Sequence, residues 1–413
     1  MTRTAAPVQA LTVETTPLDD VRQLIPFLDA RHPLLWLRRG EGIAGIGAAV
    51  RLEFTGPSRI TDAADAWRTL AAAAQVSDPV RVPGTGLVAF GTFAFADDSA
   101  ATSVLIVPEV IVGRRDGRSW VTTISTTDAP AAASPRPTAF GPEFRLTMGP
   151  GRLTAAGYGD AVASAVARIG AGEVRKVVLS RELRAHLPAG ADVRRALVEL
   201  ALGYADCWTF AVDGFLGASP ETLVRVTDGR ADARVLAGTA ARGGNADTDG
   251  RSAAALSASG KDLAEHAFAV DSVLEALRPH TSSLDARGPF ALKLPNLWHL
   301  ATDVSGALAD GSSALDLVAA LHPTAAVAGT PREAALAVID ELEPFDRGRY
   351  AGPVGWIGAD GSGEWAVALR SAQIDEAGDI TAYAGGGIVA DSDPVLEVAE
   401  TTMKFRPIVE AFG

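Results

Sequence analysis

The sequence is poor in cysteine and in positive charge. A single cysteine among 413 residues excludes an internal disulfide and any zinc or iron–sulfur site built from cysteine ligands, and this usage is typical of a reducing compartment. Lys and Arg number 37 against 50 Asp and Glu, which gives a formal net charge of -13. Nucleic acids and anionic membranes are bound by clustered basic residues, so we expect a small-molecule ligand instead.

Long apolar runs and nucleotide-binding motifs are also missing. No stretch approaches the roughly 18 apolar residues of a membrane span, and the N-terminus lacks the pattern of a signal peptide. We therefore expect an unprocessed cytoplasmic protein. Neither the phosphate loop nor the dinucleotide fingerprint occurs. The segment NADTDG (245–250) begins like a calcium loop, but Leu256 stands where a bidentate glutamate is required, so we interpret it as a flexible polar loop.

The order of the predicted elements indicates an α+β fold. Hydrophobic residues make up 47% of the chain, enough for a large core. Residues 1–145 predict an N-terminal lobe of short strands and turns with one helix near 60–75, and the Pro-rich segment 133–142 is the best boundary. Region 150–413 alternates helical patterns with adjacent runs of strands, which favours antiparallel sheets. We expect the two regions to form one interleaved fold. The helical patterns lie at 158–173, 259–278, 331–343 and at the C-terminus.

Two helices are predicted to carry carboxylates on a stripe. In EVAETTMK, Glu397, Glu400 and Lys404 fall on one side of a helix that begins at Pro394, with Leu396 and Met403 on one flank and Val398 and Phe405 on the other. Pro407 should disturb this helix, so the projection extends only to about residue 406. The acids would then lie among apolar neighbours.

The helix near 259–278 repeats the pattern with Asp262, Glu265 and His266. The alternative for either stripe is an acidic pair on a solvated face. Buried carboxylates need a compensating partner, however, and four of them on two helices predict a hard cation such as Mg²⁺ held through oxygen ligands. Lys404 would neutralise one acid or contact an anionic substrate.

Three further charged residues are candidates for a site. Lys176 begins a mostly apolar strand; it is either a solvated strand end or, if partly buried, a base. Glu221 follows Pro220 between apolar strands and is otherwise a turn carboxylate. Arg370 shares its predicted strand face with small alanines, which leaves space for a carboxylate held in bidentate fashion; the alternative is a cross-strand salt bridge. His299 and His322 are each compatible with core packing or with ligand contact.

Taken together, eight segments resemble the chorismate-utilising enzymes, which comprise anthranilate, aminodeoxychorismate, isochorismate and salicylate synthases. The resemblance covers residues 155–413 densely and 90–98 weakly. It implies an α+β fold of two stacked antiparallel β-sheets with helices outside and an active site in a cleft. It also implies Mg²⁺ bound through Glu265 and Glu400, with Asp262 and Glu397 nearby. The segments, in order, are KVVLSRE, SPETLVRV, LAGTAARG, SGKDLAEHAFAVDSV, LHPTAAVAGTPREAA, RGRYAGPVGWIG, EWAVALRSA and AGGGIVADSDPVLEVAETTMK.

Two positions favour one branch of this family. Relatives that form amines have Gln where this chain has Lys176, and aminodeoxychorismate synthases carry a nucleophilic Lys where it has Ala237. The resemblance therefore implies water as the nucleophile and the isomerisation of chorismate to isochorismate, for menaquinone or siderophore biosynthesis. No glutaminase subunit is expected, and we expect a monomer. The alternatives are a salicylate synthase, which also eliminates pyruvate, and a chorismate-binding protein without turnover.

The resemblance also implies roles for individual residues. Lys176 would deprotonate the water that attacks C2 of chorismate, while Glu221 protonates the departing C4 hydroxyl. Mg²⁺ would hold the ring carboxylate. Positions that hold the substrate carboxylates match Tyr350, Arg370, Gly387 and Lys404, and positions that line the ring match Thr239, His299 and Val327.

Overall fold

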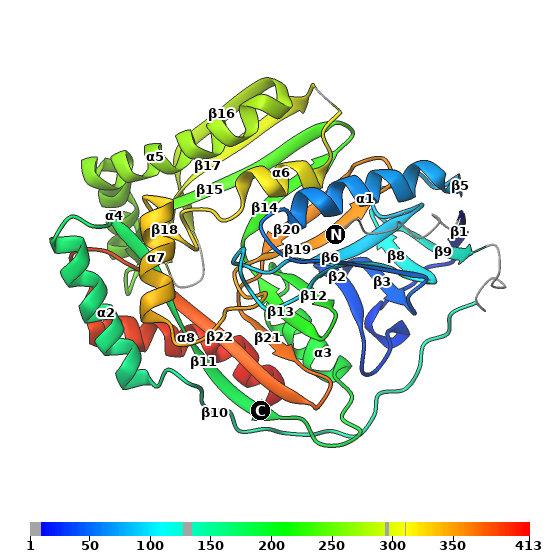
Figure 1. Cartoon of the computed structure of the whole chain (residues 1–413), viewed down its shortest axis with the longest axis horizontal. Coiled ribbons are helices and arrows are strands. Elements are labelled where there is room, and N and C mark those ends of the chain that lie inside the picture. Colours follow the sequence, from blue (N-terminus) through cyan, green and yellow to red (C-terminus); the bar gives the residue numbers. More distant parts are fainter. Residues whose placement is uncertain (1–9, 127–133, 294–296, 310) are drawn as a thin grey trace.

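Two large, mainly antiparallel sheets form the centre of the computed structural model (Figure 1). The structure describes residues 10–126, 134–293, 297–309 and 311–413, without the side chains of Thr239, Lys261, Glu265 and Leu297. Neighbouring strands pair antiparallel throughout these residues, except β1 with β5, which are parallel. With helices between the strands, this arrangement confirms the predicted α+β class.

The strands of each sheet follow one another in a fixed spatial order. The 13-stranded sheet runs β10 (Gly149–Pro150), β11 (Lys176–His186), β22 (Asp379–Ile388), β21 (Ser371–Ile374), β13 (Phe215–Ser219), β12 (Trp208–Val212), β2 (Leu34–Arg38), β3 (Glu41–Ile46), β8 (Val110–Arg115), β9 (Arg118–Thr126), β1 (Leu11–Leu18) and β5 (Gln75–Ser77), with β18 (Gly329–Thr330) beside β11. The nine-stranded sheet runs β16 (Thr281–Lys293), β17 (Leu297–Leu308), β15 (Arg230–Ala241), β14 (Thr222–Thr227), β20 (Gly363–Val367), β19 (Pro353–Gly358), β6 (Val88–Thr92), β7 (Ser103–Val107) and β4 (Val50–Phe54).

Each sheet joins a block of strands from before residue 145 to a block of strands from the later part of the chain. In the first sheet β2 pairs with β12, and in the second β6 pairs with β19. Both pairings join elements that are more than a hundred residues apart in the chain. At each pairing the edge strand of one region is hydrogen-bonded to the edge strand of the other. The sheets are therefore continuous across the Pro-rich segment.

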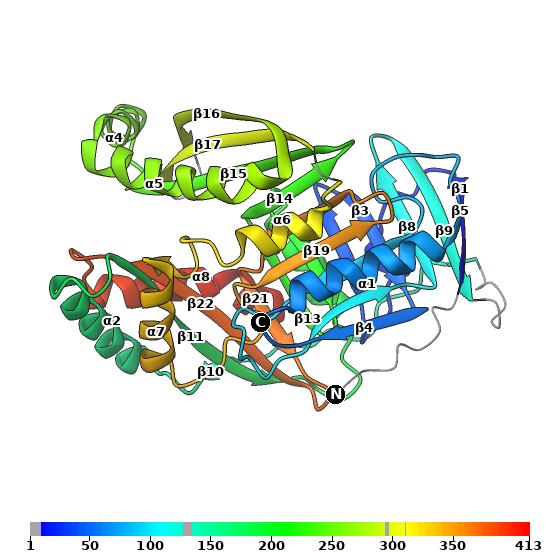
Figure 2. The same cartoon turned by 45° about the horizontal axis from the view of Figure 1, so that its top comes forward.

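The helices pack on the outer faces of the sheets. They are α1 (Arg59–Ala73), α2 (Ala155–Gly170), α3 (Arg194–Gly203), α4 (Ala246–Ala258), α5 (Gly260–Leu277), α6 (Ala314–Leu321), α7 (Arg332–Leu342) and α8 (Pro394–Phe412), with short 3-10 turns at Ile25–Phe27 and Arg278–His280. Helix α8 packs on β22 and against α2 and α3, while α5 packs on β15 and β17. Figure 2 shows α4 and α5 in one layer with β15–β17, opposite the layer of α2, α7 and α8.

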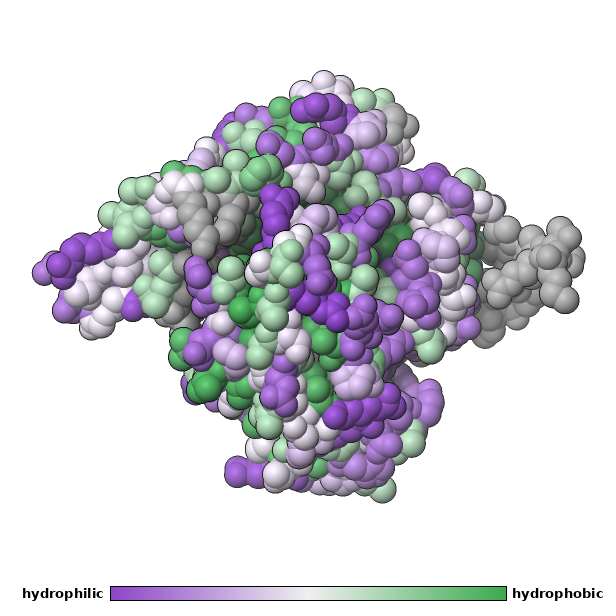
Figure 3. Space-filling view, turned by 60° about the vertical axis from the view of Figure 1, so that its left-hand side comes forward, coloured by the Kyte–Doolittle hydropathy of each residue, from purple (hydrophilic) through white to green (hydrophobic). Residues whose placement is uncertain are grey.

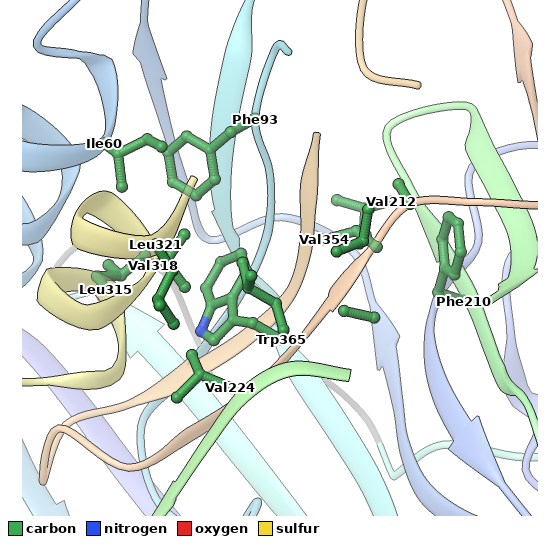
Figure 4. Packing of buried hydrophobic residues seen from close by; sticks show 14 of the residues in the cluster. Ile60, Phe93, Phe210, Val212, Val224, Leu315, Val318, Leu321, Val354 and Trp365 are labelled. Atoms are coloured by element: carbon green, nitrogen blue, oxygen red, sulfur yellow. The ribbon is translucent and has the colours of Figure 1, made fainter. Parts of the chain in front are cut away.

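The main core lies between the sheets and under α1 and α6. Figure 4 shows Trp365 of β20 beside Leu315, Val318 and Leu321 of α6, with Phe93 and Ile60 close by. These side chains come from both ends of the chain, so the core joins them. Figure 3 shows hydrophilic and hydrophobic residues mixed over one outer face. Among the described residues, none of the helices combines the length and the apolar character that a membrane span requires.

The segment NADTDG is not a flexible loop, which corrects the prediction. Asn245 caps α4: its side chain accepts a hydrogen bond from the Thr248 N–H (2.9 Å), and Thr248 completes a capping box. Asp249 accepts hydrogen bonds from Arg242 and from Trp298 Nε1 (2.8 Å). The polar residues that suggested a loop are therefore the start of a helix.

Helix α8 does not end near residue 406 either. It continues through Pro407 to Phe412. Pro407 is buried, and the neighbouring Phe405, Ile408 and Phe412 are 1–2% exposed in a second hydrophobic core. Packing of this face compensates the one backbone hydrogen bond that proline removes.

Candidate active site

Lys176 is the first residue of β11 and lies beside a glycine of β22. It is partly buried, and its partner across the sheet edge is Thr330 of β18. A Cβ placed on Gly387 would lie 2.9 Å from Lys176 Cε and 3.5 Å from Nζ. Only a residue without a side chain leaves this space, so Gly387 accommodates the lysine. The prediction that Lys176 begins a mostly apolar strand is confirmed.

Glu221 lies between β13 and β14 with its backbone fixed on both sides. Its N–H donates to Ser219 Oγ (3.2 Å), and its carbonyl accepts from the Val367 N–H (3.1 Å). Burial raises the pKa of the Glu221 carboxyl, while the positive charges of Lys176 and Lys404 oppose the shift. The group therefore retains its proton to a higher pH than an exposed glutamate.

Arg370 lies in the turn between β20 and β21, not inside one long strand as predicted. Its backbone is left-handed (φ 51°), and its carbonyl accepts from the Ala218 N–H (3.1 Å). Gly217 permits the close approach of this turn, because a Cβ on Gly217 would lie 2.6 Å from the Arg370 carbonyl oxygen. The guanidinium donates to the Lys404 carbonyl (3.3 Å) and forms no ion pair with a carboxylate of the described residues.

Tyr350 presents a protonated phenol beside this guanidinium. Its ring stacks on Tyr383 with centroids 5.2 Å apart, and the residue is 5% exposed. Burial raises the pKa of Tyr350 to about 12, although the charges of Arg347 and Arg370 act in the opposite direction. The hydroxyl is therefore a hydrogen-bond donor near neutral pH.

Helix α8 brings two carboxylates and a lysine to the same region. Asp393 caps the helix through the Val395 and Leu396 N–H groups (2.8 and 3.0 Å). Glu400 Oε1 and Lys404 Nζ form an ion pair (2.6 Å), and Lys404 also donates to the Gly385 carbonyl (2.7 Å). The predicted stripe therefore exists, and Lys404 neutralises one of its acids.

One flank of the stripe differs from the prediction. Leu396 and Met403 are 70% and 55% exposed, and the Glu400 side chain is 51% exposed. The buried face of α8 is instead the one with Phe405, which packs toward β22, α2 and α3. The stripe therefore lies at the edge of the packed surface. The helical projection alone does not say which flank meets the sheet, so the prediction missed this.

Glu397 is the more enclosed acid of the pair. It accepts a hydrogen bond from Ser392 Oγ (2.8 Å). A Cβ on Gly386 would lie 2.7 Å from Glu397 Oε2, so glycine provides the space for this carboxylate. Burial raises the pKa of Glu397, Ser392 opposes the shift, and the like charge of Glu400 raises it further. Sequence reasoning missed Ser392 and Gly386, since their contacts arise only where the loop after β22 returns to α8.

On α5, Asp262 and His266 have different surroundings. Asp262 is half-buried, and a Cβ on Gly238 would lie 3.3 Å from its Cβ. His266 is 2% exposed; Nδ1 donates to the Ala237 carbonyl (3.1 Å), and Nε2 lies 2.7 Å from Thr302 Oγ1. Burial lowers the pKa of His266, so this residue is a neutral link between α5, β15 and β17. The predicted side chains of Glu265 and Thr239 lie outside the described residues.

The two other candidate histidines and Val327 have different surroundings. His299 donates through Nδ1 to the Gly238 carbonyl (3.2 Å); burial lowers its pKa, as do the charges of Lys176 and Lys404. His322 is a core residue whose Nε2 donates to the Phe95 carbonyl (3.0 Å), and burial lowers its pKa to about 3. Val327 is 3% exposed in the main core.

The structure thus brings most of the predicted residues into one electrostatically coupled region. Lys176 and Lys404 act on both Glu221 and His299. Glu400 acts on His299 and on Arg370. The region combines a lysine, a carboxyl whose pKa is raised by burial, and cationic donors, which suits acid–base chemistry on an anionic molecule.

The carboxylates of α8 fit a divalent cation. Burial raises the pKa of Glu397, and the like charge of Glu400 adds to this shift; a cation between the two carboxylates would relieve their repulsion. Within the described residues, no three acidic, histidine or cysteine side chains already form a ready metal-binding group. The side chain of Glu265, which the resemblance places among the ligands, is outside that set.

Comparison with known proteins identifies the family of this chain. The model of the chorismate binding enzyme family matches residues 8–413. Isochorismate synthase DhbC of Bacillus subtilis is 41% identical over 62% of this chain and 67% of its own length. The salicylate biosynthesis isochorismate synthase of Pseudomonas aeruginosa is 35% identical over 98% of this chain and 90% of its own. The menaquinone-specific isochorismate synthase MenF of Escherichia coli has a similar structure, with a TM-score of 0.77 and 26% identity over 97% of this chain and 95% of that one. The chain belongs to the chorismate-binding enzyme family.

Proposed function

We propose that this enzyme is an isochorismate synthase that converts chorismate reversibly to isochorismate. The observation that carries the proposal is that Lys176 lies within electrostatic reach of Glu221, a buried carboxyl whose pKa is raised by burial. The names of the relatives at 35–41% identity support it. A protein that only bound chorismate would have no use for both groups.

In the proposed reaction, Lys176 acts as the base and Glu221 as the acid. The neutral amine of Lys176 takes a proton from the water that attacks C2, the ring double bonds shift, and the C4 hydroxyl leaves as water with the proton of Glu221. Water is thus added and released, so substrate and product have equal mass. Burial, which raises the pKa of Glu221, keeps that proton available for the departing hydroxyl.

The substrate carboxylates are assigned to the cationic donors. Arg370 has no carboxylate partner among the described residues, and Tyr350 beside it is a phenol donor. Lys404, in the middle of α8, would contribute a further charge. We assign Thr239, His299 and Val327 to the ring surroundings; neutral His299 suits this position. Gly387 serves the same site by leaving space for Lys176.

Mg²⁺ is the proposed cofactor, with Glu400 and Glu265 as ligands and Asp262 and Glu397 near it. When bound, the cation would neutralise a substrate carboxylate and the repulsion between the α8 acids. Since water is the nucleophile, the enzyme needs no glutaminase subunit, and we propose that it acts as a cytoplasmic monomer. Relatives named for menaquinone and for salicylate share the fold, and we propose that the product feeds a menaquinone or a siderophore pathway.

The test is product analysis by NMR. With chorismate and Mg²⁺ near neutral pH, the wild-type enzyme should give a mixture of chorismate and isochorismate that is approached from either side, with little pyruvate at early times. Stoichiometric salicylate and pyruvate would replace this proposal with a salicylate synthase. Stable binding of chorismate without any product would indicate a binding protein.

A further inference from the structure

One edge of β11 lacks a strand partner where it passes the candidate site. On its other side, β11 pairs with β22 from Val177 to His186. On this edge β18 covers only Lys176 and Val177, and β10 covers only Leu183 and Arg184. Between these two strands, loop backbone bonds only the ends of the stretch: the Val178 N–H donates to the Ala328 carbonyl (2.9 Å), and the Glu182 carbonyl accepts from the Gly151 N–H (3.0 Å). The Val178 carbonyl and the Ser180 N–H face no neighbouring strand among the described residues. Buried backbone groups without partners are costly.

The side chains of Glu343 and Arg347 fill this gap. Glu343 Oε1 accepts from the Ser180 N–H (2.7 Å) and from Ser180 Oγ (3.0 Å). Arg347 Nη2 donates to the Val178 carbonyl (2.6 Å). The carboxylate supplies the acceptor, and the guanidinium the donor, that an adjacent strand would otherwise present.

The two side chains are also bonded to each other and enclosed. Arg347 Nε and Nη2 donate to the two oxygens of Glu343 (2.8 and 2.6 Å), and both side chains are 2% exposed. The Arg347 guanidinium lies 4.5 Å over the ring of Phe95. A planar guanidinium satisfies these partners together, which the single ammonium of lysine does not.

The same pair reaches the other segments that carry site residues. Arg347 Nη1 donates to the Val327 carbonyl (2.9 Å), and the Tyr350 N–H donates to the Arg347 carbonyl (3.0 Å). The Val178 N–H in turn donates to the Ala328 carbonyl (2.9 Å). One ion pair therefore connects β11, which begins at Lys176, with the backbone of Val327 and Tyr350.

We infer that Glu343 and Arg347 form a side-chain substitute for the missing strand and are positioning residues that set Lys176 and Val327 relative to the bound substrate. The catalytic part of this inference rests on the proposed function. Neither side chain needs to touch the substrate. If the pair is loosened, the base and the ring surroundings shift together, whereas a site residue changed alone affects only its own contact.

The first measurement does not depend on activity. Arg347→Lys keeps the charge but loses the fork, and Arg349→Lys is the matched control, because Arg349 is also buried in the same loop but pairs with Asp213 and bonds to the Thr102 carbonyl. Hydrogen exchange of peptides that cover 176–182 and 324–330 should be faster in Arg347→Lys than in the wild type and unchanged in Arg349→Lys. Equal exchange of both variants in these peptides would overturn the strand substitute, whatever the enzyme catalyses.

The second measurement is kinetic. A displacement of about 1 Å costs up to roughly 100-fold in rate, so Arg347→Lys should lower kcat by tens of fold with little change in KM, and raise the ratio of pyruvate to isochorismate. Partial unfolding would lower kcat but leave KM and the product ratio unchanged, and that result would contradict the positioning role. Failure of the proposed function is distinguishable, because then the wild type itself forms no isochorismate.

Discussion

At the scale of single residues, Glu221 and Lys176 illustrate how surroundings determine chemistry. A glutamate in water loses its proton well below neutral pH, and a lysine in water keeps its own. Burial moves Glu221 toward its protonated form. Lys176 lies partly buried against Gly387 and acts electrostatically on Glu221. These two residues therefore yield the sharpest tests of the proposed chemistry.

Replacing Lys176 with Gln should remove hydration of chorismate while preserving the fold. The amide has a similar size but no basic nitrogen, so we expect the rate to fall about 10²- to 10⁴-fold, with the melting temperature near that of the wild type. Initial rates and calorimetry measure the two quantities. Lys293→Gln, the same change on an exposed lysine that pairs with Asp249, is the control. Turnover by Lys176→Gln at the wild-type rate would refute its assignment as the base.

The raised pKa of Glu221 predicts opposite effects on activity and on stability. Between the unfolded pKa and the raised folded pKa, the folded state holds a proton that the unfolded state has lost. Its contribution to stability is complete below the unfolded pKa and is lost as pH rises through the folded value. Glu221→Gln removes this loss, so the variant should be at least as stable as the wild type near neutral pH.

The same Glu221→Gln variant should lose turnover by about 10²- to 10⁴-fold, because the amide is a poor proton donor. In the wild type, the rate should decline on the alkaline side as Glu221 ionises. Unfolding by denaturant at acid and neutral pH, with pH–rate profiles, tests both parts. An active variant that is also less stable near neutral pH would contradict the assignment of a buried, protonated acid.

At the scale of elements, α8 carries both structural and chemical functions. Its Phe405 face packs into the second core, while Glu397, Glu400 and Lys404 lie at the border of that face. Arg181 of β11 adds to the attachment, since its Nε donates to Thr401 Oγ1 (2.9 Å) and its guanidinium lies 4.9 Å over Phe405. The helix therefore holds its carboxylates at a fixed place against the sheet.

Glu400→Gln should weaken Mg²⁺ binding specifically. A neutral amide is a poorer ligand for a hard cation than a carboxylate, so the concentration of Mg²⁺ that gives half-maximal rate should rise at least tenfold, about 1.4 kcal/mol. The stabilisation of the fold by Mg²⁺, read from the melting temperature, should shrink in parallel. Glu410→Gln, on the same helix but bonded to Tyr204 and Arg406, should change neither. Full activity of the wild type in excess chelator would rule out the cation.

At the scale of the whole molecule, the two regions of the chain share both sheets. Residues 150–413 alone would lose β1–β9, which exposes β12 and β19 as unpaired edges beside an opened core. Exposed apolar edges promote aggregation. The chain is therefore predicted to behave as one folding unit in spite of its Pro-rich boundary.

Expression of residues 150–413 alone should give a product that aggregates or unfolds without a cooperative transition, measured by circular dichroism and light scattering. Expression together with residues 1–145 should recover some folded protein, because the missing strands are supplied in trans. A soluble 150–413 fragment with a cooperative transition near that of the full chain would show that the regions are separate domains.

The sequence by itself determined the local features and the residue types of the candidate site. Helices α2, α5 and α7 and the hairpin of β19 and β20 follow from periodicity and turn residues. The α+β class and the family follow from ordered motifs. Two local predictions were wrong. The polar residues of 245–250 were interpreted as a loop but form the capping box of α4, and α8 continues through Pro407 because its buried face packs in the core.

Only the tertiary structure decided which of these residues meet. Lys176, Glu221 and Arg370 come from distant parts of the chain, and strand pairing places them in one coupled region. The turn at Arg370, the exposed flank of α8 and the ion pair of Glu343 with Arg347 likewise have no local signal. The physical reason is that side-chain periods report which face is apolar, whereas the burial, the pKa and the partners of a charged group depend on segments that lie elsewhere in the chain.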